Sequence, residues 1–378
     1  MPQRRTWDIF CTVVDNYGDI GVTWRLARQI AAEHGRAVRL WVDDPASFAR
    51  IAPGLDPALD TQVLRGVQVR HWANAFPGVE PGDAVVEAFA CHLPENHVVR
   101  MAQCASKPAW INLEYLSAEK WVTATHALPS PHARLPLTKY FFFPGFSEKT
   151  GGLLRERDLL ARRDAFQRDR SAQAAFWQTL GLAPAAENEL RVLLFCYANP
   201  ALPTLLKAWV ASPVRVTCLF PEGPALPVVR DYFGEPGANQ FERGNLRMHV
   251  LPFIEQDDFD KLLWACDVNF VRGEDSFVRA QWAGRPFVWH IYPQDDDAHW
   301  PKLEAFLDLH TAGADLSTAA RIRFLWHAWN RGHDAGAKWH DYLAGRATIA
   351  THSGAWAARL TAQPDLAAKL VNFCDNLL

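Results

Sequence analysis

The chain has 378 residues, 49% of them hydrophobic, and a formal net charge of −3. This charge argues against nucleic acid as a partner, because proteins that bind nucleic acid carry a basic excess. No segment approaches the roughly 18 uninterrupted apolar residues of a membrane-spanning helix, so a membrane is not expected as a partner either.

The N-terminal segment MPQRRTWDIFC contains two arginines but neither a long apolar region nor a small-residue cleavage site. The seven cysteines are scattered without a CxxC pair, and most lie in apolar runs, as reduced core thiols do. Both observations predict a cytoplasmic protein.

The first predicted strand runs from Trp7 to Val14, and a helix is expected from about Val22 to Ala32. The turn between them holds Asp15 and Asp19, which could both face a crevice above a sheet. The alternative is that Asp15 stabilises the turn and Asp19 caps the helix. The turn lacks the GxGxxG pattern, which argues against a dinucleotide site. Arg25 on the helix is expected in solvent.

Strands and helices then alternate as far as residue 113, with strands expected at 37–42, 67–72, 84–89 and 109–113 and helices at 45–51 and 95–104. This alternation is typical of a doubly wound parallel sheet with helical crossovers. The segment from Ser117 to Phe146 breaks it with three prolines and a run of aromatic residues. We expect a long loop there, which either borders the ligand crevice, docks a partner, or is an irregular loop fixed by buried phenylalanines.

The charged segment from Arg155 to Leu180 suits an exposed helix, and the polar residues after Gly181 predict a domain boundary near residue 184. The alternation then restarts, with strands expected at 190–197, 214–219 and 246–253 and helices at 202–211 and 257–266. A chain of this length suits two domains of ordinary size. We therefore predict two halves of similar architecture.

The centre of the second half is a predicted strand, turn, helix and strand between Val268 and Ile291. Val268–Val271 is typical of a strand buried on both faces, and Gly284 and Pro286 end the helix that follows. The turn reads Arg-Gly-Glu-Asp-Ser from Arg272 to Ser276. Ligands bind at the carboxyl ends of strands in open parallel sheets, and an arginine beside a helix N-terminus suits a phosphorylated ligand with sugar hydroxyls. The alternative is a capped helix whose carboxylates only complement its dipole.

The run Asp295-Asp296-Asp297 could suggest a divalent metal site. We expect no metal there, because these residues precede a predicted helix near Ala298, where the helix dipole favours acidic residues. The fourteen histidines show neither HExxH nor Cys/His spacing, so no zinc site is expected. His290 and His299 are expected as core or cap histidines, although they could line a donor cleft.

Two Rossmann-like halves with polar turns at their strand ends are the architecture of the GT-B glycosyltransferases, whose two domains face each other across a cleft. Two stretches carry a more specific resemblance, FCTVVDNYGDIGVTWRLARQ and NFVRGEDSFVRAQWAGRPFVWHIYPQDDDAH. They are similar to the two signature blocks of the EarP family, and the similarity extends over the whole chain. The resemblance implies an α/β fold of the GT-B type with an acceptor-binding domain at 1–184, a nucleotide-sugar-binding domain at 185–359 and a C-terminal helix, 360–378, that packs on the first domain.

Members of the EarP family are protein-arginine rhamnosyltransferases of bacterial translation elongation factor P. The resemblance therefore implies an inverting glycosyltransferase that moves L-rhamnose from dTDP-β-L-rhamnose to an arginine side chain of elongation factor P and so activates it. It implies no cofactor and no metal, since GT-B enzymes usually use basic residues and helix dipoles in place of a metal.

The resemblance also assigns roles to particular residues. Asp15 and Asp19 match the family's essential aspartates, and Glu274 matches its catalytic glutamate. Three residues match those that hold the diphosphate of dTDP and neighbouring groups, namely Arg272, Asp275 and Ser276. Four more match the region that binds the thymine and the deoxyribose, namely Phe195, Tyr197, Phe253 and Gln256.

The chemistry requires a base, because an arginine guanidinium stays protonated far above neutral pH and is a poor nucleophile. A carboxylate must position it and accept a proton as the new bond forms. Asp19 is the first choice, with Asp15 orienting the same guanidinium, but neighbouring carboxylates titrate as a pair and the sequence leaves the assignment open. Two other function classes also remain open: a nucleotide-binding regulator without catalysis, and another GT-B transferase or an epimerase with a small-molecule substrate.

Overall fold

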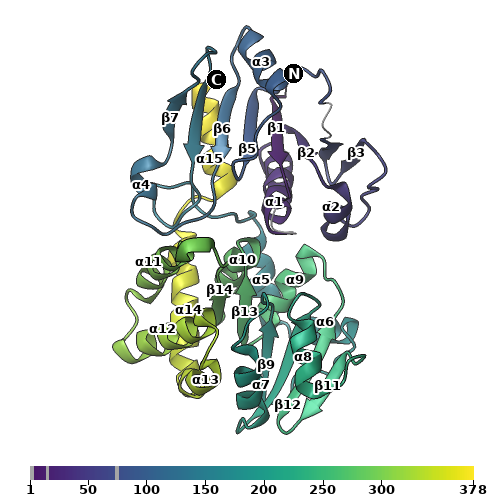
Figure 1. The fold of residues 1–378 in the computed structure, drawn as a ribbon, viewed down its shortest axis with the longest axis vertical. Coiled ribbons are helices and arrows are strands. Elements are labelled where there is room, and N and C mark those ends of the chain that lie inside the picture. The colour runs from purple at the N-terminus through teal and green to yellow at the C-terminus, as the bar shows by residue number, and fades with distance from the viewer. Residues whose placement is uncertain (1–3, 14–16, 73–75) are drawn as a thin grey trace. The chain divides into compact units, whose positions relative to one another are not determined.

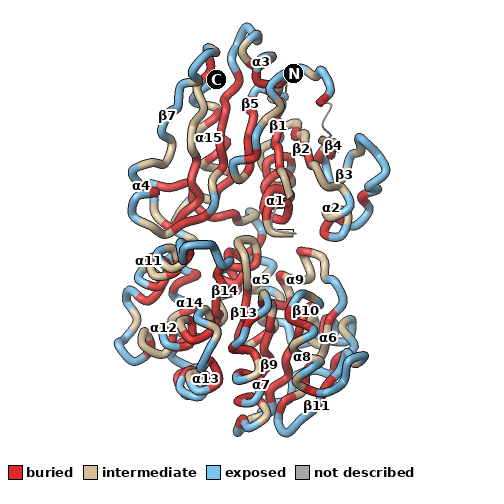
Figure 2. The backbone as a smooth tube through the Cα atoms, in the orientation of Figure 1, coloured by how far each residue is buried: buried red, intermediate tan, exposed pale blue. Residues whose placement is uncertain are grey.

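The computed structural model describes residues 4–13, 17–72 and 76–378, and the chain forms two compact units (Figure 1). Unit 1 comprises residues 1–157 and 362–378, and unit 2 comprises residues 158–361. Each unit is a mostly parallel sheet with helices packed on it, which is the Rossmann-like architecture expected from the alternating pattern. Figure 2 shows that the central strands of each sheet are buried along nearly their whole length.

The described strands of unit 1 form one sheet. They are β1 (Thr6–Cys11), β2 (Ala37–Val42), β3 (Thr61–Leu64), β4 (Val67–His71), β5 (Ala84–Ala88), β6 (Ala109–Leu113), β7 (Leu128–Pro131) and β8 (Thr138–Phe142). Their order is β3-β4-β2-β1-β5-β6-β8-β7, and only the two edge strands, β3 and β7, pair antiparallel to their neighbours. Because β1, β5 and β6 are parallel neighbours, the segments that follow them leave the sheet at the same edge.

Helices cover both faces of this sheet. They are α1 (Gly18–Glu33), α2 (Pro45–Ile51), α3 (Glu95–Gln103) and α15 (Leu366–Leu377), whereas the short α4 (Val122–Thr125) lies in the connection from β6 to β7. Helices α1 and α15 share one hydrophobic core, in which α15 buries Leu370, Val371 and Cys374. The N–H of Leu366 also donates to the carbonyl of Leu153 at 2.9 Å. The C-terminal helix is therefore an integral layer of unit 1.

The segment 117–146, expected as a long loop, contains α4, β7 and β8. Strand β8 pairs in parallel with β6, and β7 pairs antiparallel with β8. Pro129 and Pro131 lie in β7, an edge strand, where the missing N–H of proline is tolerated. The prediction of a structureless loop is wrong because the prolines mark a sheet edge.

The described strands of unit 2 form a second sheet. They are β9 (Glu189–Leu194), β10 (Arg215–Pro221), β11 (Gln240–Arg243), β12 (Leu246–Leu251), β13 (Val268–Arg272) and β14 (Phe287–His290). Their order is β11-β12-β10-β9-β13-β14, with only β11 antiparallel to its neighbour. The carboxyl ends of β9, β13 and β14 therefore lie side by side.

Unit 2 is rich in helices and aromatic residues. Its helices are α5 (Leu159–Arg168), α6 (Arg170–Thr179), α7 (Leu202–Val210), α8 (Leu226–Phe233), α9 (Gln256–Ala265), α10 (Asp275–Ala283), α11 (His299–Thr311), α12 (Leu316–Arg331), α13 (Ala335–Ala344) and α14 (Arg346–Thr361). The rings of Trp209, Trp329 and Trp339 lie 6.0, 5.1 and 6.1 Å from the ring of Phe270 on β13. Interlocked aromatic rings thus bury the strand that leads to the predicted ligand turn.

The division between the units falls at residue 158 and not near residue 184 as predicted, because α5 and α6 belong to unit 2. Arg163 on α5 donates from Nη1 to the carbonyl of Trp282 at 2.7 Å. Gln167 donates from Nε2 to the carbonyls of Trp264 and Ala283 at 3.2 and 3.1 Å. These carbonyls lie at the ends of α9 and α10, so the polar residues of α5 satisfy two helix C-termini. The polar and charged side chains that predicted an exposed helix before the boundary therefore bind helix C-termini inside unit 2.

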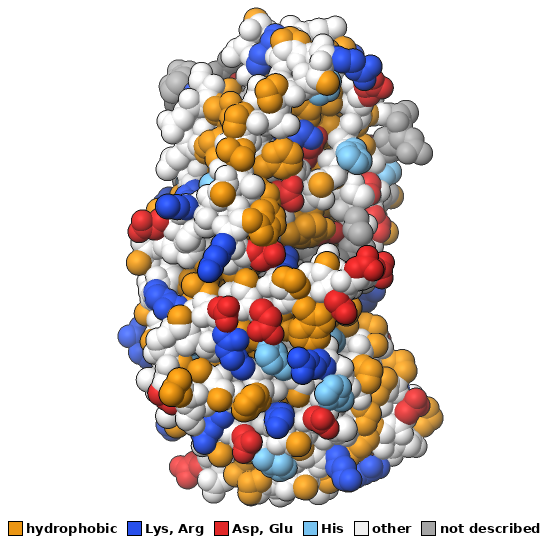
Figure 3. All heavy atoms as spheres, turned by 60° about the vertical axis from the view of Figure 1, so that its left-hand side comes forward, with side chains coloured by type: hydrophobic (Ala, Val, Ile, Leu, Met, Phe, Trp, Pro, Cys, Tyr) orange, Lys and Arg blue, Asp and Glu red, His pale blue; other side chains and the backbone are white. Residues whose placement is uncertain are grey.

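The surface of the described residues carries charges of both signs. On the face drawn in Figure 3, basic and acidic side chains are interspersed with hydrophobic ones. Among the described helices, none has both the length and the apolar character needed to cross a membrane. All seven cysteines are free thiols, and all except Cys104 are buried.

Candidate active site

The turn between β13 and α10 carries four of the predicted site residues and is fixed from both sides. Gly273 has a φ of +62°, a left-handed conformation that suits glycine. The hydroxyl of Ser276 accepts from the N–H of Arg272 at 3.1 Å and donates to the carbonyl of Arg272 at 2.5 Å. The indole Nε1 of Trp289 on β14 donates to the carbonyl of Gly273 at 2.8 Å. Ser276 is only 6% exposed, and the two hydrogen bonds of its hydroxyl to the backbone of Arg272 hold the turn in shape.

Arg272 lies over two aromatic rings at the end of the neighbouring strand. Its Cζ is 4.7 Å from the ring centroid of Phe195 and 4.5 Å from that of Tyr197. The chain places them together because β9 and β13 are parallel neighbours that end at the same edge. Cation–π contacts of this kind orient a guanidinium without neutralising its charge. Three of the predicted donor-site residues are thus brought together within unit 2.

His290 lies beside Arg272, its partner in the β13–β14 register, and its ring is 5.3 Å from that of Tyr197. Burial, with smaller contributions from the positive charges of Arg272 and His299, lowers the pKa of His290 to about 3. His290 is therefore a neutral core histidine near pH 7, and Arg272 keeps the positive charge of this edge. Tyr292 lies 5.4 Å from Tyr197 and is 52% exposed.

The N-termini of α9 and α10 are tied together by two predicted residues. Gln256, the first residue of α9, donates from Nε2 to Oδ2 of Asp275 at 3.2 Å. Phe253 lies in the connection from β12 to α9 and is 37% exposed. Two helix N-termini that point to one place provide positive potential for an anionic ligand. The resemblance had suggested Gln256 and Asp275 for different parts of the nucleotide, and the structure joins them directly.

Glu274 occupies the N-cap position of α10 and is partly buried. Its side chain makes no capping hydrogen bond to α10. Glu274 places a negative charge in the same turn as Arg272, which gives the turn two chemically different ends.

In unit 1, Asp19 lies inside the first turn of α1 and is 3% exposed. The helix begins at Gly18, four residues earlier than predicted, so Asp19 is not its N-cap. The hydroxyl of Tyr115 donates to Oδ1 of Asp19 at 3.2 Å. Sequence reasoning missed Tyr115, whose only signal was its place two residues after a buried strand. Asp15, the predicted companion of Asp19, lies outside the described residues.

The acidic run Asp295-Asp296-Asp297 forms a short 3₁₀ helix, η1 (Asp295–Asp297), and all three residues are exposed. Asp296 and Asp297 have φ angles of +57° and +58°. Across residues 4–13, 17–72 and 76–378, no group of three or more His, Cys, Asp or Glu side chains is placed to hold a metal ion. Among the described residues, none therefore joins this acidic run in a set of metal ligands.

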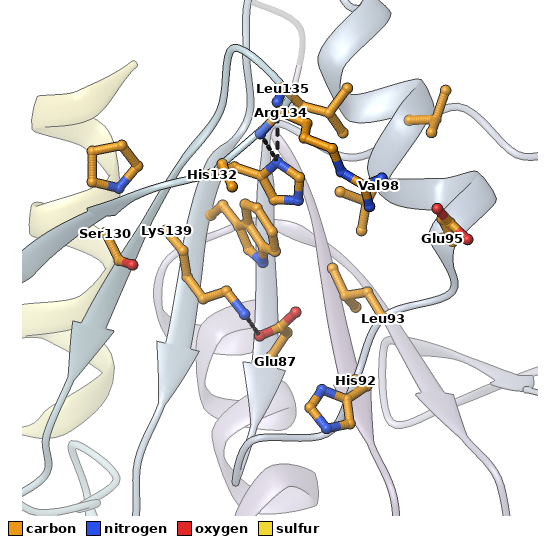
Figure 4. Close-up of a pocket in the computed structure, with 14 residues that line it drawn as sticks. Glu87, His92, Leu93, Glu95, Val98, Ser130, His132, Arg134, Leu135 and Lys139 are labelled. Carbon is orange, nitrogen blue, oxygen red and sulfur yellow. Dashed lines mark hydrogen bonds and ion pairs between the residues drawn. The ribbon is translucent and has the colours of Figure 1, made fainter.

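Unit 1 also contains a cavity of about 680 Å³ over β5, β6 and β8, shown in Figure 4. At its floor, Lys139 forms an ion pair with the buried Glu87 at 2.7 Å, and its Nζ lies 4.6 Å from the ring centroid of Trp110. Burial raises the pKa of Glu87, although Lys139 opposes the shift. None of the predicted site residues lines this cavity, and its central charges neutralise each other. It is therefore separate from the candidate site.

The chain matches, over residues 7–375, the family model described as elongation factor P (EF-P) rhamnosyltransferase EarP. A relative from Pseudomonas putida named protein-arginine rhamnosyltransferase is 52% identical over 380 residues, covering 99% of this chain and 100% of the relative. Relatives of the same name from Pseudomonas aeruginosa and Neisseria meningitidis are 51% and 38% identical, covering 99% and 97% of this chain and 100% and 96% of their own lengths.

Solved structures show the same fold. One described as the structural basis for EarP-mediated arginine glycosylation of translation elongation factor EF-P has a TM-score of 0.70 and 39% identity, covering 99% of this chain and 100% of its own. The spinosyn rhamnosyltransferase SpnG in complex with thymidine diphosphate has a TM-score of 0.52 and 12% identity, covering 98% and 99%. At that identity the likeness concerns the fold alone, which is GT-B.

Proposed function

The chain belongs to the EarP family of elongation factor P rhamnosyltransferases, and we propose that it transfers L-rhamnose from dTDP-β-L-rhamnose to one arginine side chain of elongation factor P, with inversion at the anomeric carbon. The observation that carries this proposal is the extent of the match, which spans residues 7–375 and includes both polar turns. As its acceptor is a translation factor, the enzyme would act in the cytoplasm.

In this proposal unit 2 binds the donor. Arg272, oriented by Phe195 and Tyr197, and the N-terminus of α10 supply positive potential. Both stabilise the negative charge that develops on the leaving diphosphate as its bond to the anomeric carbon breaks. Phe253 and Gln256 are assigned, with the two rings, to the thymine and the deoxyribose.

The remaining residues of the turn have two different tasks. Ser276 and Asp275 keep the turn in shape through their bonds to Arg272 and Gln256. Glu274 has no electrostatic reason to approach phosphate oxygens of its own sign. We therefore assign Glu274 to the sugar hydroxyls or to the reacting arginine.

Unit 1 supplies the base. One guanidinium nitrogen of the acceptor attacks the anomeric carbon, the carbon–oxygen bond to the diphosphate breaks, and the guanidinium proton passes to a carboxylate. A single displacement converts the β-linked donor into an α-linked product. Asp19 is the preferred base because it is buried and held by Tyr115. Asp15 is assigned to orient the same guanidinium.

The test is incubation of the protein with dTDP-β-L-rhamnose and elongation factor P, followed by the intact mass of the acceptor. We expect an increase of one deoxyhexose, absent when the modified arginine of the acceptor is replaced by lysine. A regulator without catalysis would bind dTDP and leave the donor intact. A small-molecule transferase or an epimerase would consume the donor without changing the acceptor mass. Either result would contradict the proposal.

A further inference from the structure

Asp19 is a carboxylate in an unusual place, since its side chain is 3% exposed in the first turn of a helix packed on the main core of unit 1. A buried carboxylate needs hydrogen-bond donors to remain ionised, and each donor also fixes the direction in which its oxygens point. The hydroxyl of Tyr115 is such a donor, at 3.2 Å from Oδ1. A phenol with an ordinary pKa of about 10 keeps its proton at neutral pH and can only donate to a carboxylate.

The backbone around Tyr115 is built to hold its ring. Asp19, Phe89 and Tyr115 follow β1, β5 and β6, three adjacent strands, so they meet at one edge of the sheet. The rings of Phe89 and Tyr115 stack at 4.6 Å with an interplanar angle of 20°. Stacking of this kind restricts the ring on which the hydroxyl is carried.

Phe89 is held in place by strained backbone. Phe89 and Ala90 have φ angles of +57° and +56°, a region that residues other than glycine rarely adopt. The N–H of Phe89 donates to the carbonyl of Leu113 at 2.7 Å, and the N–H of Cys91 donates to that of Ala88 at 3.2 Å. Two consecutive left-handed residues that direct one aromatic ring onto another point to a functional constraint at this edge.

We propose that Tyr115 is a positioning residue for Asp19, holding the carboxylate through its hydroxyl in the orientation that receives the guanidinium of the acceptor. This inference rests on the proposed function and deepens it. During transfer the guanidinium proton passes to the carboxylate of Asp19, and Tyr115 keeps its own proton throughout. The hydroxyl contributes to the transition state through Asp19 and does not touch the donor.

The central test is Tyr115→Phe, which removes the hydroxyl and keeps the ring that stacks on Phe89. We expect kcat to fall by about ten- to a hundred-fold, the effect of losing one hydrogen bond to a charged group. The KM values for dTDP-β-L-rhamnose and for elongation factor P should stay within about twofold, because the hydroxyl acts through Asp19 and removal of its bond leaves the carboxylate in place. Tyr140→Phe is the matched control. Tyr140 is a partly buried tyrosine of the same sheet whose ring centroid lies 5.4 Å from that of Phe373. The kcat of Tyr140→Phe should equal that of the unaltered protein.

Two further variants separate positioning from a structural role. Phe89→Gly suits the left-handed backbone but removes the stacking ring, so it should lower kcat less than Tyr115→Phe and leave KM unchanged. In an Asp19→Asn background, the residual transfer rate is measured in a long single-turnover reaction. Adding Tyr115→Phe should not lower this rate further, because the effects of replacing two residues that act together are not additive.

Three results would overturn the inference: an unchanged kcat for Tyr115→Phe, a raised acceptor KM with unchanged kcat, or a full additional loss in the Asp19→Asn background. The second result would make Tyr115 a binding contact for the acceptor. If the unaltered protein adds no deoxyhexose to elongation factor P, it is the proposed function that fails. The two failures are therefore distinguishable in one experiment.

Discussion

Replacement of Arg272 by alanine is the most direct probe of the donor site. Arg272 ends β13, and its guanidinium lies 4.7 and 4.5 Å from the ring centroids of Phe195 and Tyr197. The rings hold the cation in one orientation before any ligand arrives, so little side-chain freedom remains to be lost on binding. Arg272→Ala removes the cation and leaves the aromatic walls.

The expected loss follows from the bonds that this guanidinium makes with a diphosphate. Charge-assisted hydrogen bonds contribute about 1.5–3 kcal/mol, which corresponds to a loss of affinity between about tenfold and about 150-fold. The loss should be the same for dTDP and for dTDP-β-L-rhamnose, because the diphosphate is common to both. Calorimetric titration of each ligand measures it.

Two control variants sharpen the result. Arg272→Lys keeps the charge but not the planar fork that stacks on rings and pairs with phosphate oxygens, so its affinity should be intermediate. Arg247→Ala removes a partly exposed arginine of β12 that pairs with the exposed Glu242 at 3.3 Å, so dTDP affinity should not change. If Arg272→Ala binds dTDP within twofold of the unaltered protein, the assignment of Arg272 to the diphosphate is wrong.

Four other predictions follow from the same geometry. Asp15→Ala and Asp19→Ala should each abolish transfer while dTDP affinity, measured by calorimetry, stays nearly unchanged; an equal loss of dTDP binding would remove both residues from the acceptor side. Glu274→Gln should depress turnover more than dTDP affinity, and a loss of dTDP binding as large as that of Arg272→Ala would make Glu274 part of the nucleotide pocket. Transfer should continue in excess EDTA, and an activity loss restored by Mg²⁺ or Mn²⁺ would contradict this. Burial, with a smaller effect of the charge of Lys369, lowers the pKa of His126 to about 4, so the folded state favours the neutral ring. The contribution of neutral His126 to the stability of the fold is therefore complete above about pH 6.5, and it is lost as the pH falls toward 4. The melting temperature of His126→Gln should therefore fall less over this range than that of the unaltered protein, and parallel curves would refute the reasoning.

The strand, turn, helix and strand between Val268 and Ile291 could be predicted from sequence almost residue by residue. Its strands are apolar runs, and Gly284 takes the left-handed C-cap with a φ of +65°. Local signals suffice there because strand, turn and helix are contiguous. The family resemblance assigns Arg272, Phe195 and Tyr197 to one site but does not predict that the guanidinium lies over the two rings. That contact depends on β9 and β13 being neighbours, and strand order cannot be deduced from a local sequence pattern.

Long-range contacts account for what the sequence did not predict. The early start of α1 was missed because the glycines at positions 18 and 21 suggested a turn, whereas packing against the sheet outweighs their low helix propensity. Arg25, expected in solvent, is 1% exposed and lies 3.6 Å from Glu156, far along the chain. The bond between Tyr115 and Asp19 depends on β1, β5 and β6 being adjacent, which no local pattern encodes.

The return of α15 to unit 1 determines the order in which the two units can be completed during translation. Unit 2 is one uninterrupted segment, so all of its residues are synthesised before the helix that closes unit 1. Until then, the surface that α15 covers in the core of unit 1 has no partner helix and exposes apolar side chains. A chain that stops after residue 361 would keep every described strand of both sheets and still lack Leu370, Val371 and Cys374 from that core. Until α15 has been added, unit 1 is thus the unit that exposes core surface to aggregation or to chaperones.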